Sequence, residues 1–238
     1  MRIEVLYPEL GMLYGDPGNL AYLKACLPDA EIINTDNKSI PAFVKSEADL
    51  VYVASMTENN QLIAIRALSN YINELKREIQ KGTFFLFTGN TIELLGQYIE
   101  TETGEKIDCL GLYDFHTCRD MTKRINYLFL GDYEGLKIVG NKSQFSTLQG
   151  NITPPFITVE KGLGNNEDDH YEGLHDHNLF ATYLLGPFLV LNPLFTEQLI
   201  KAIDSNNELA FRQEIMEAYN HRLEEMNRPE LHYRLSEH

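Results

Sequence analysis

The chain is poor in basic residues, in cysteine and in long apolar runs, and each shortage excludes a class of protein. It has 20 lysines and arginines against 35 acidic residues, a net charge of −15, so nucleic acid and anionic membrane surfaces would repel it. Cys26, Cys109 and Cys118 are odd in number and widely spaced, which indicates reduced thiols and no CxxC metal pair. The most apolar stretch, residues 181–191, is too short to span a bilayer.

The residues that are present indicate a folded cytoplasmic protein. Hydrophobic residues make up 43% of the 238 positions and charged residues 23%, a composition that supports a sizeable core and argues against disorder. The first residues, MRIEVLYPEL, begin directly as a strand, without a charged segment followed by an apolar signal sequence. We expect no cofactor, and a protein or a small molecule as the partner.

The first half of the chain alternates strand and helix patterns. A helix over residues 58–80 is predicted by isoleucines and leucines at intervals of three and four residues, with Ser55 and Glu58 spaced as a capping box. A second helix is predicted over residues 17–26, with Asp16 as its cap. The expected strands cover residues 2–7, 30–34, 49–54 and 83–88, the last of them a continuous apolar run typical of a central parallel strand.

The second half has short strand patterns separated by Gly, Asn, Asp and Pro, which favour antiparallel hairpins. A last amphipathic helix is predicted over about residues 207–226, with Phe211, Ile215, Tyr219 and Leu223 on one face. We expect residues 1–238 to form one three-layer α/β domain whose mainly parallel sheet is extended by antiparallel strands. These strands are expected over residues 110–115, 124–130, 136–139 and 156–160.

The segment FLFTGNTIELLGQ, residues 85–97, predicts a buried strand, a tight turn and a helix. Many enzymes hold a nucleophile at the apex of such an elbow, where the backbone is strained and amides of the next helix face a developing oxyanion. Gly89 stands at this apex, where glycine removes the strain but supplies no nucleophile. Taken alone, the glycine is better explained by an ordinary strand–helix connection.

Four further segments occur in a familiar order: LYGDPGN (13–19), GLGNNEDD (162–169), EGL (172–174) and LFATYLLGP (179–187). Together with the elbow they resemble the CobB/CobQ-like class I glutamine amidotransferases, most closely the glutaminase subunits of lipid II isoglutaminyl synthases. The similarity covers about residues 3–193. It implies a flavodoxin-like three-layer fold, a cysteine at the elbow and a histidine in a TYLHGP segment. It also implies a Mur-ligase-like partner that uses the released ammonia to amidate a peptidoglycan precursor.

The chain departs from this pattern wherever the family keeps its chemistry. Counting back from the shared LLG, residues 94–96, the cysteine falls on Gly89, or on Thr88 with a shift of one residue. The histidine position holds Leu185, and the glycine-rich strand end that supplies oxyanion amides falls on residues 54–56, Ala-Ser-Met. Three coordinated changes predict that glutaminase activity has been lost and that the chain acts as a binding or regulatory subunit.

Two other functions remain open from the residues. In the first, the chain is an amidase or hydrolase of altered mechanism that uses Thr88, Asn90, a Cys118–His116 pair or the loop from His170 to His177. In the second, a vacated pocket binds an amino acid without reaction. The residues expected at this pocket are Asp16, Asn19, Ser55, Met56, Thr88 and Asn90.

Residues 165–177, NNEDDHYEGLHDH, are the densest group of possible metal ligands. His170, His175, His177, Asp168 and Asp169 are residue types that ligate zinc, but their spacing matches no compact metal motif. We interpret the segment as a solvated acidic loop and expect no metal.

Overall fold

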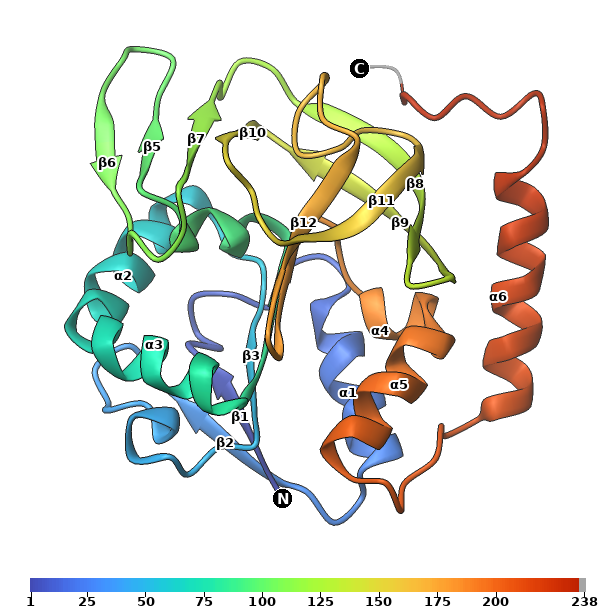
Figure 1. The fold of residues 1–238 in the computed structure, drawn as a ribbon, viewed down its shortest axis with the longest axis horizontal. Helices are drawn as coiled ribbons and strands as arrows, with labels where there is room; N and C mark the ends of the chain where they lie inside the picture. The colour runs from blue at the N-terminus through green and yellow to red at the C-terminus, as the bar shows by residue number, and fades with distance from the viewer. Residues whose placement is uncertain (236–238) are drawn as a thin grey trace.

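The computed structural model describes residues 1–235 of the chain as an α/β fold built on two sheets. The larger sheet has nine strands (Figure 1). In spatial order they are β2 (Glu31–Thr35), β1 (Arg2–Leu6), β3 (Leu50–Val53), β4 (Phe84–Thr88), β13 (Leu179–Thr182), β12 (Tyr171–Asp176), β11 (Pro155–Lys161), β8 (Ile125–Tyr133) and β9 (Leu136–Gln144).

Strand direction divides the large sheet into two parts. The five strands from β2 to β13 are parallel, and the remaining strands from β12 to β9 add to them in antiparallel register. This mixed sheet with an antiparallel extension confirms the predicted fold class. The sequence patterns did not predict the second, four-stranded sheet, ordered β10 (Ser146–Gly150), β7 (Phe115–Arg119), β5 (Tyr98–Glu100) and β6 (Lys106–Asp108).

Both faces of the parallel strands are covered by helices, which explains why β3 and β4 are continuous apolar runs. Val51 and Val53 face a core that includes α2 (Glu58–Leu68) and α3 (Ile72–Lys81), whereas Leu50 and Tyr52 face a core that includes α1 (Asp16–Cys26). The second core also contains residues of α4 (Phe188–Leu191) and α5 (Pro193–Ile203), and Figure 1 shows these two groups of helices on opposite sides of the sheet.

The single helix predicted over residues 58–80 is wrong, because the chain forms two helices joined by a 3-10 turn at Ser69–Tyr71. Ser69 Oγ donates to the carbonyl oxygen of Arg66 at 2.9 Å, and Asn70 Nδ2 donates to the same oxygen at 3.1 Å. Side chains of this kind offer the backbone an alternative to the regular helical hydrogen bonds. The apolar spacing continues across the break, which is why the pattern alone did not reveal it.

The predicted helix caps are also wrong. Gly15 precedes α1, and Asp16 is the first helical residue, with no side-chain cap bond. At the start of α2 the cap is Thr57, whose Oγ1 accepts a hydrogen bond from the backbone N–H of Asn60 at 3.3 Å. Asp16 and Ser55 hydrogen-bond each other instead, as described below.

Two expected elements in the second half differ from the structure. Residues 110–114 form no strand, and β7 begins only at Phe115. The last helix, α6 (Arg212–Met226), begins five residues after the predicted start, since Phe211 has a left-handed conformation with φ +51° and is 70% exposed. Its packing side contains Ile215, Tyr219 and Met226. None of the helices in residues 1–235 combines the length and apolar character needed to cross a bilayer.

Candidate functional site

The elbow after β4 is closed by glycine because no side chain fits there. Gly89 has φ +61° and starts the 3-10 helix η3 (Gly89–Leu95). A Cβ built on Gly89 would lie 2.6 Å from Ser55 Cβ and 3.5 Å from Leu185 Cδ2. The first distance is far below van der Waals contact, so Ser55 occupies the space into which a side chain at the apex would project. Leu185, from the segment after β13, lies beside the same point.

A buried polar network lies under the elbow and ties the ends of β3 and β4 to the start of α1. One oxygen of the Asp16 carboxylate accepts from the backbone N–H of Ser55 at 2.7 Å and from its hydroxyl, and the other accepts from Thr88 Oγ1 at 3.0 Å and from Asn19 Nδ2 at 3.2 Å. The Tyr52 hydroxyl accepts from Asn19 Nδ2 at 3.0 Å. Burial raises the pKa of Tyr52 well above its usual range. These groups satisfy one another, so the network stabilises the fold without needing a ligand.

The segments before α1 and after β13 approach each other at backbone distance. A Cβ on Gly15 would lie 2.4 Å from the carbonyl carbon and oxygen of Gly186, and a Cβ on Gly186 would lie 2.4 Å from the backbone nitrogen of Asp16. Glycine is needed at both positions for this close contact. The LYGDPGN and LLGP segments therefore have a packing role that does not depend on any reaction.

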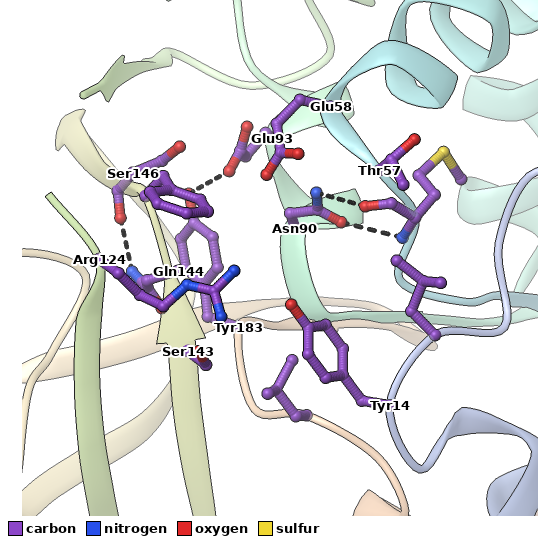
Figure 2. A pocket seen from close by; sticks show the side chains of 14 residues that line it. Tyr14, Thr57, Glu58, Asn90, Glu93, Arg124, Ser143, Gln144, Ser146 and Tyr183 are labelled. Carbon is purple, nitrogen blue, oxygen red and sulfur yellow. Dashed lines mark hydrogen bonds between the residues drawn. The ribbon is translucent and has the colours of Figure 1, made fainter. Parts of the chain in front are cut away.

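A cavity of about 160 Å³ lies in front of the elbow (Figure 2). One wall comes from β9, β10 and the residue before β8 and carries Arg124 and Gln144, and the opposite wall carries Thr57 and Asn90. No cysteine or histidine of residues 1–235 lines this cavity. The lining residues are Leu13, Tyr14, Met56, Thr57, Glu58, Asn90, Glu93, Arg124, Ser143, Gln144, Phe145, Ser146, Tyr183 and Leu185.

The expected pocket residues fall into two groups. Met56 and Asn90 line the cavity, and the Asn90 side chain accepts from the backbone N–H of Met56 at 3.1 Å and donates to its carbonyl oxygen at 2.8 Å. The other four, Asp16, Asn19, Ser55 and Thr88, do not line it, and all four are fully buried in the network beneath. The hydrogen-bonding groups of these four residues are directed at one another, and their contact with a ligand stays a prediction.

The cavity holds charged groups of both signs. Arg124 is exposed, and its guanidinium lies over the ring of Phe145, 4.7 Å from the centroid, a cation–π contact. No carboxylate within residues 1–235 lies at ion-pair distance from it. Glu58 is half-buried and lies near Glu93 at the opposite end from Tyr14 (Figure 2). Tyr14 is 56% exposed at the edge of the cavity and has φ +55°.

Glu93 is the centre of a second buried network, behind the cavity. Its carboxylate pairs with Arg119 at 2.5 Å, and it accepts from the Tyr183 hydroxyl at 3.0 Å and from Gln61 Nε2 at 3.3 Å. Burial lowers the pKa of Arg119, but the neighbouring Glu93 carboxylate raises it by more, so the net shift is upward. Burial and Glu93 both raise the pKa of Tyr183. The Arg119 guanidinium therefore keeps its charge, and Glu93 accepts hydrogen bonds from three buried donors.

A third buried network changes the interpretation of residues 165–177 as a solvated loop. Residues from Tyr171 onward form β12, in which Glu172 is fully buried. Its Oε1 lies 3.4 Å from Nζ of the equally buried Lys142, which also donates to the carbonyl oxygen of Gly164 at 2.8 Å. Glu172 further accepts from Thr182 Oγ1 at 2.7 Å and from the backbone N–H of Tyr183 at 2.8 Å. This part of the segment is a core strand.

The histidines of that segment do not gather into a site. His175 stacks on Phe180 with ring centroids 4.2 Å apart, and burial lowers its pKa. His177 Nδ1 lies 2.8 Å from Asp176 Oδ1, and His170 is exposed. Within residues 1–235, no three His, Cys, Asp or Glu side chains are grouped so that they could hold a metal ion.

The Cys118–His116 pair considered as an alternative nucleophile and base lies on β7, away from the cavity lining. The His116 ring stacks on Tyr98 with centroids 4.8 Å apart, and no hydrogen bond joins it to Cys118. Burial raises the pKa of the Cys118 thiol, which disfavours the reactive thiolate. The geometry gives this pair no means of activation.

Several cavity residues were not found by sequence reasoning. Glu93 gave a weak signal, as the one acid in the apolar run TIELLG, and Tyr183 was treated only as a family match. Arg124 immediately precedes β8, and Gln144 is the last residue of β9. They reach the cavity only because the antiparallel extension brings these strand ends beside the elbow, and no local pattern encodes that.

Comparison with known proteins gives the same family as the sequence motifs. The model for the CobB/CobQ-like glutamine amidotransferase domain matches residues 2–193. The chain is 28% identical over 228 residues to the Staphylococcus aureus lipid II isoglutaminyl synthase (glutamine-hydrolyzing) subunit GatD, covering 87% of this chain and 91% of that protein. It is 27% identical to the Streptococcus pneumoniae subunit of the same name, and the match covers 84% of this chain and 79% of that protein.

Solved structures agree on the fold. A glutamine amidotransferase crystal structure superimposes with a TM-score of 0.53 at 12% identity, covering 84% of this chain and 97% of that chain. A glutamine amidotransferase from Thermotoga maritima gives a TM-score of 0.51 at 11% identity, and the match covers 95% of this chain and 97% of that chain. With the family model matching most of its length, the chain belongs to the CobB/CobQ-like glutamine amidotransferase family.

Proposed function

We propose that this chain is a glutamine amidotransferase-family subunit that has lost glutaminase activity and acts as a binding or regulatory subunit in peptidoglycan precursor amidation. The observation that carries the proposal is the elbow itself. Gly89 supplies no nucleophile, Ser55 Cβ fills the space beside it, and Leu185 lies where the family resemblance places the proton-shuttling histidine. A thioester mechanism needs both a thiolate and a base next to it.

The rest of the family framework is intact, which favours a retained role as a subunit. The Asp16 network holds Ser55 and Thr88 at the elbow, and Glu172 and the contact of Gly15 with Gly186 hold the segment after β13. Both similar relatives are named as subunits of a lipid II isoglutaminyl synthase. We propose a Mur-ligase-like chain as the partner, in agreement with the family resemblance.

A catalytic threonine is the strongest competing enzyme hypothesis, because Thr88 Oγ1 donates to the Asp16 carboxylate at 3.0 Å. Several facts argue against it. Both residues are fully buried, neither lines the cavity, and the same carboxylate already accepts hydrogen bonds from Ser55 and Asn19. A nucleophile must reach its substrate, so this pair is better explained as structural.

The proposal is tested by measuring ammonia release from glutamine and by affinity purification of the tagged full-length chain from its own cells. We expect ammonia at the level of a no-protein control, and a ligase-type chain that co-purifies. The matched control is Leu185→Ala, which should leave the ammonia signal unchanged because Leu185 takes part in no reaction. Glutamine turnover above the no-protein control would refute the loss of activity, and purification without any ligase-type chain would refute the subunit role.

An amino-acid sensor is a second candidate, favoured by one observation. The cavity is retained in front of the elbow and contains an exposed guanidinium and a half-buried carboxylate, the two groups that recognise a zwitterion. Thermal shift of the chain against the standard amino acids tests this function, since a ligand at 100 times its Kd stabilises a protein by about 2.7 kcal/mol.

A further inference from the structure

We propose that the cavity in front of the elbow binds an α-amino acid with an apolar side chain in preference to glutamine. The inference rests on the proposed function, in that it takes the cavity to be a binding site without a reaction. It names the chemical class of the ligand, and it expects an apolar ligand side chain where the family accepts the polar side chain of glutamine. The charges, the apolar wall and the size of the cavity support it.

The charged wall suits the head group of an amino acid. Arg124 presents a guanidinium that stacks on Phe145 and has no carboxylate partner within residues 1–235, so it is available to a ligand carboxylate. Glu58 is half-buried in the same lining and makes no ion pair within the described part of the chain, so it is available to an ammonium group. One cation and one anion in one small cavity fit a zwitterion better than a simple anion.

Gln144 adds an unsatisfied polar group to the wall of the cavity. The residue is only 5% exposed and lines the cavity, yet its Oε1 has no hydrogen-bond partner within residues 1–235. Its Nε2 donates to the carbonyl oxygen of Ser146 at 2.6 Å, which fixes the amide so that Oε1 is the free acceptor. Buried acceptors are rarely left unpaired, but Oε1 itself has no exposed surface, so it is an unsatisfied acceptor behind the cavity wall and no ligand contact is assigned to it.

The side toward the elbow is unsuited to a side-chain amide. Leu13, Met56 and Leu185 contribute apolar surface to the lining, and Leu185 separates it from Gly89. The one amide there, Asn90, already donates to and accepts from the backbone of Met56. A glutamine side chain placed against this surface would give up its hydrogen bonds to water and could regain only part of them, from the Tyr14 hydroxyl, whereas an aliphatic side chain would lose none.

The volume of the cavity limits the size of the ligand that it can hold. Drug and cofactor sites have volumes of about 300–1,000 Å³, and this cavity has about 160 Å³. A nucleotide or a peptide does not fit within it, but a single amino acid of the size of leucine is compatible. The expected ligand is therefore a free aliphatic amino acid, with L-leucine as the probe.

The inference is tested by isothermal titration of the full-length chain with L-leucine and with L-glutamine. We expect leucine to bind at least about tenfold more tightly than glutamine, since each tenfold corresponds to about 1.4 kcal/mol, within the usual penalty for an unpaired buried polar group. Arg124→Gln should weaken leucine binding about tenfold or more. Its matched control is Lys123→Gln, which removes the same charge from a neighbouring exposed residue outside the cavity lining and should leave binding unchanged.

Two further outcomes keep the inference separate from the proposed function. Leu13→Asn changes a half-buried residue of the apolar wall and should lower the leucine-to-glutamine affinity ratio without unfolding the chain. Glutamine binding as tight as leucine binding, no heat with leucine at millimolar concentration, or an Arg124→Gln variant that binds like wild type would each overturn the inference. Ammonia release from glutamine would refute the loss of activity, a different result that the titration does not measure.

Discussion

Substituting Gly89 by alanine tests the account of the elbow, because the two costs of the added methyl can be estimated separately. The left-handed backbone at φ +61° disfavours any residue with a Cβ, by about 1–2 kcal/mol. Overpacking the 2.6 Å approach to Ser55 Cβ adds about 1–3 kcal/mol. The sum of about 2–5 kcal/mol corresponds to a fall in Tm of roughly 4–20 °C for a protein of this size.

A double-mutant cycle separates the two costs. Ser55→Gly removes the Cβ that Gly89→Ala would meet, whereas Ser55→Ala removes only the hydroxyl and keeps that Cβ. Denaturant unfolding should therefore show Gly89→Ala costing about 1–3 kcal/mol less in the Ser55→Gly background than in the Ser55→Ala background. Equal costs in the two backgrounds would refute the reasoning that Ser55 fills the nucleophile's space. The same logic predicts that Gly89→Cys alone yields a destabilised and inactive protein.

Two further predictions concern charge and pH. Glu93→Gln leaves the buried Arg119 guanidinium uncompensated and should lower the free energy of unfolding in urea by about 3–5 kcal/mol. The control Glu100→Gln, in an exposed pair with Lys106, should lower it by less than about 1 kcal/mol. Similar losses for the two variants would contradict a buried charge pair. Burial lowers the pKa of folded His175, so its contribution to stability is present above the unfolded value of 6.5 and is lost as the pH falls below it. His175→Phe should flatten the decline in Tm between about pH 6.5 and 5, whereas exposed His170→Gln should not; an unchanged slope would count against this assignment.

Local signals were enough to predict the layered fold and the glycine at the elbow. The continuous apolar run of β4 and the glycine after it encode a buried strand followed by a turn that needs a left-handed residue. The break between α2 and α3 was missed since Ser69 and Asn70 disturb the backbone without interrupting the apolar spacing. The apolar periodicity shows which face of a helix is buried. It does not show where polar side chains compete for the hydrogen bonds of the helix backbone.

The composition of the cavity was the hardest part to predict. Asp16 looked like a helix cap because its short-range context favours one, but its partners Ser55 and Thr88 lie 39 and 72 residues away. Arg124 and Gln144 reach the cavity through the pairing of β8 with β9, a long-range arrangement. Sequence patterns report contacts within a few residues, whereas this site depends on contacts set by the topology of the sheet.

The most direct test of the central claim is the rate of ammonia release from L-glutamine by the purified full-length chain, alone and together with its co-purified partner. The account predicts a rate equal to the no-protein control in both cases, since neither Gly89 nor Leu185 can supply a thiolate or a base. A rate above that control, abolished by one substitution in the cavity or in the network beneath it, would contradict the account.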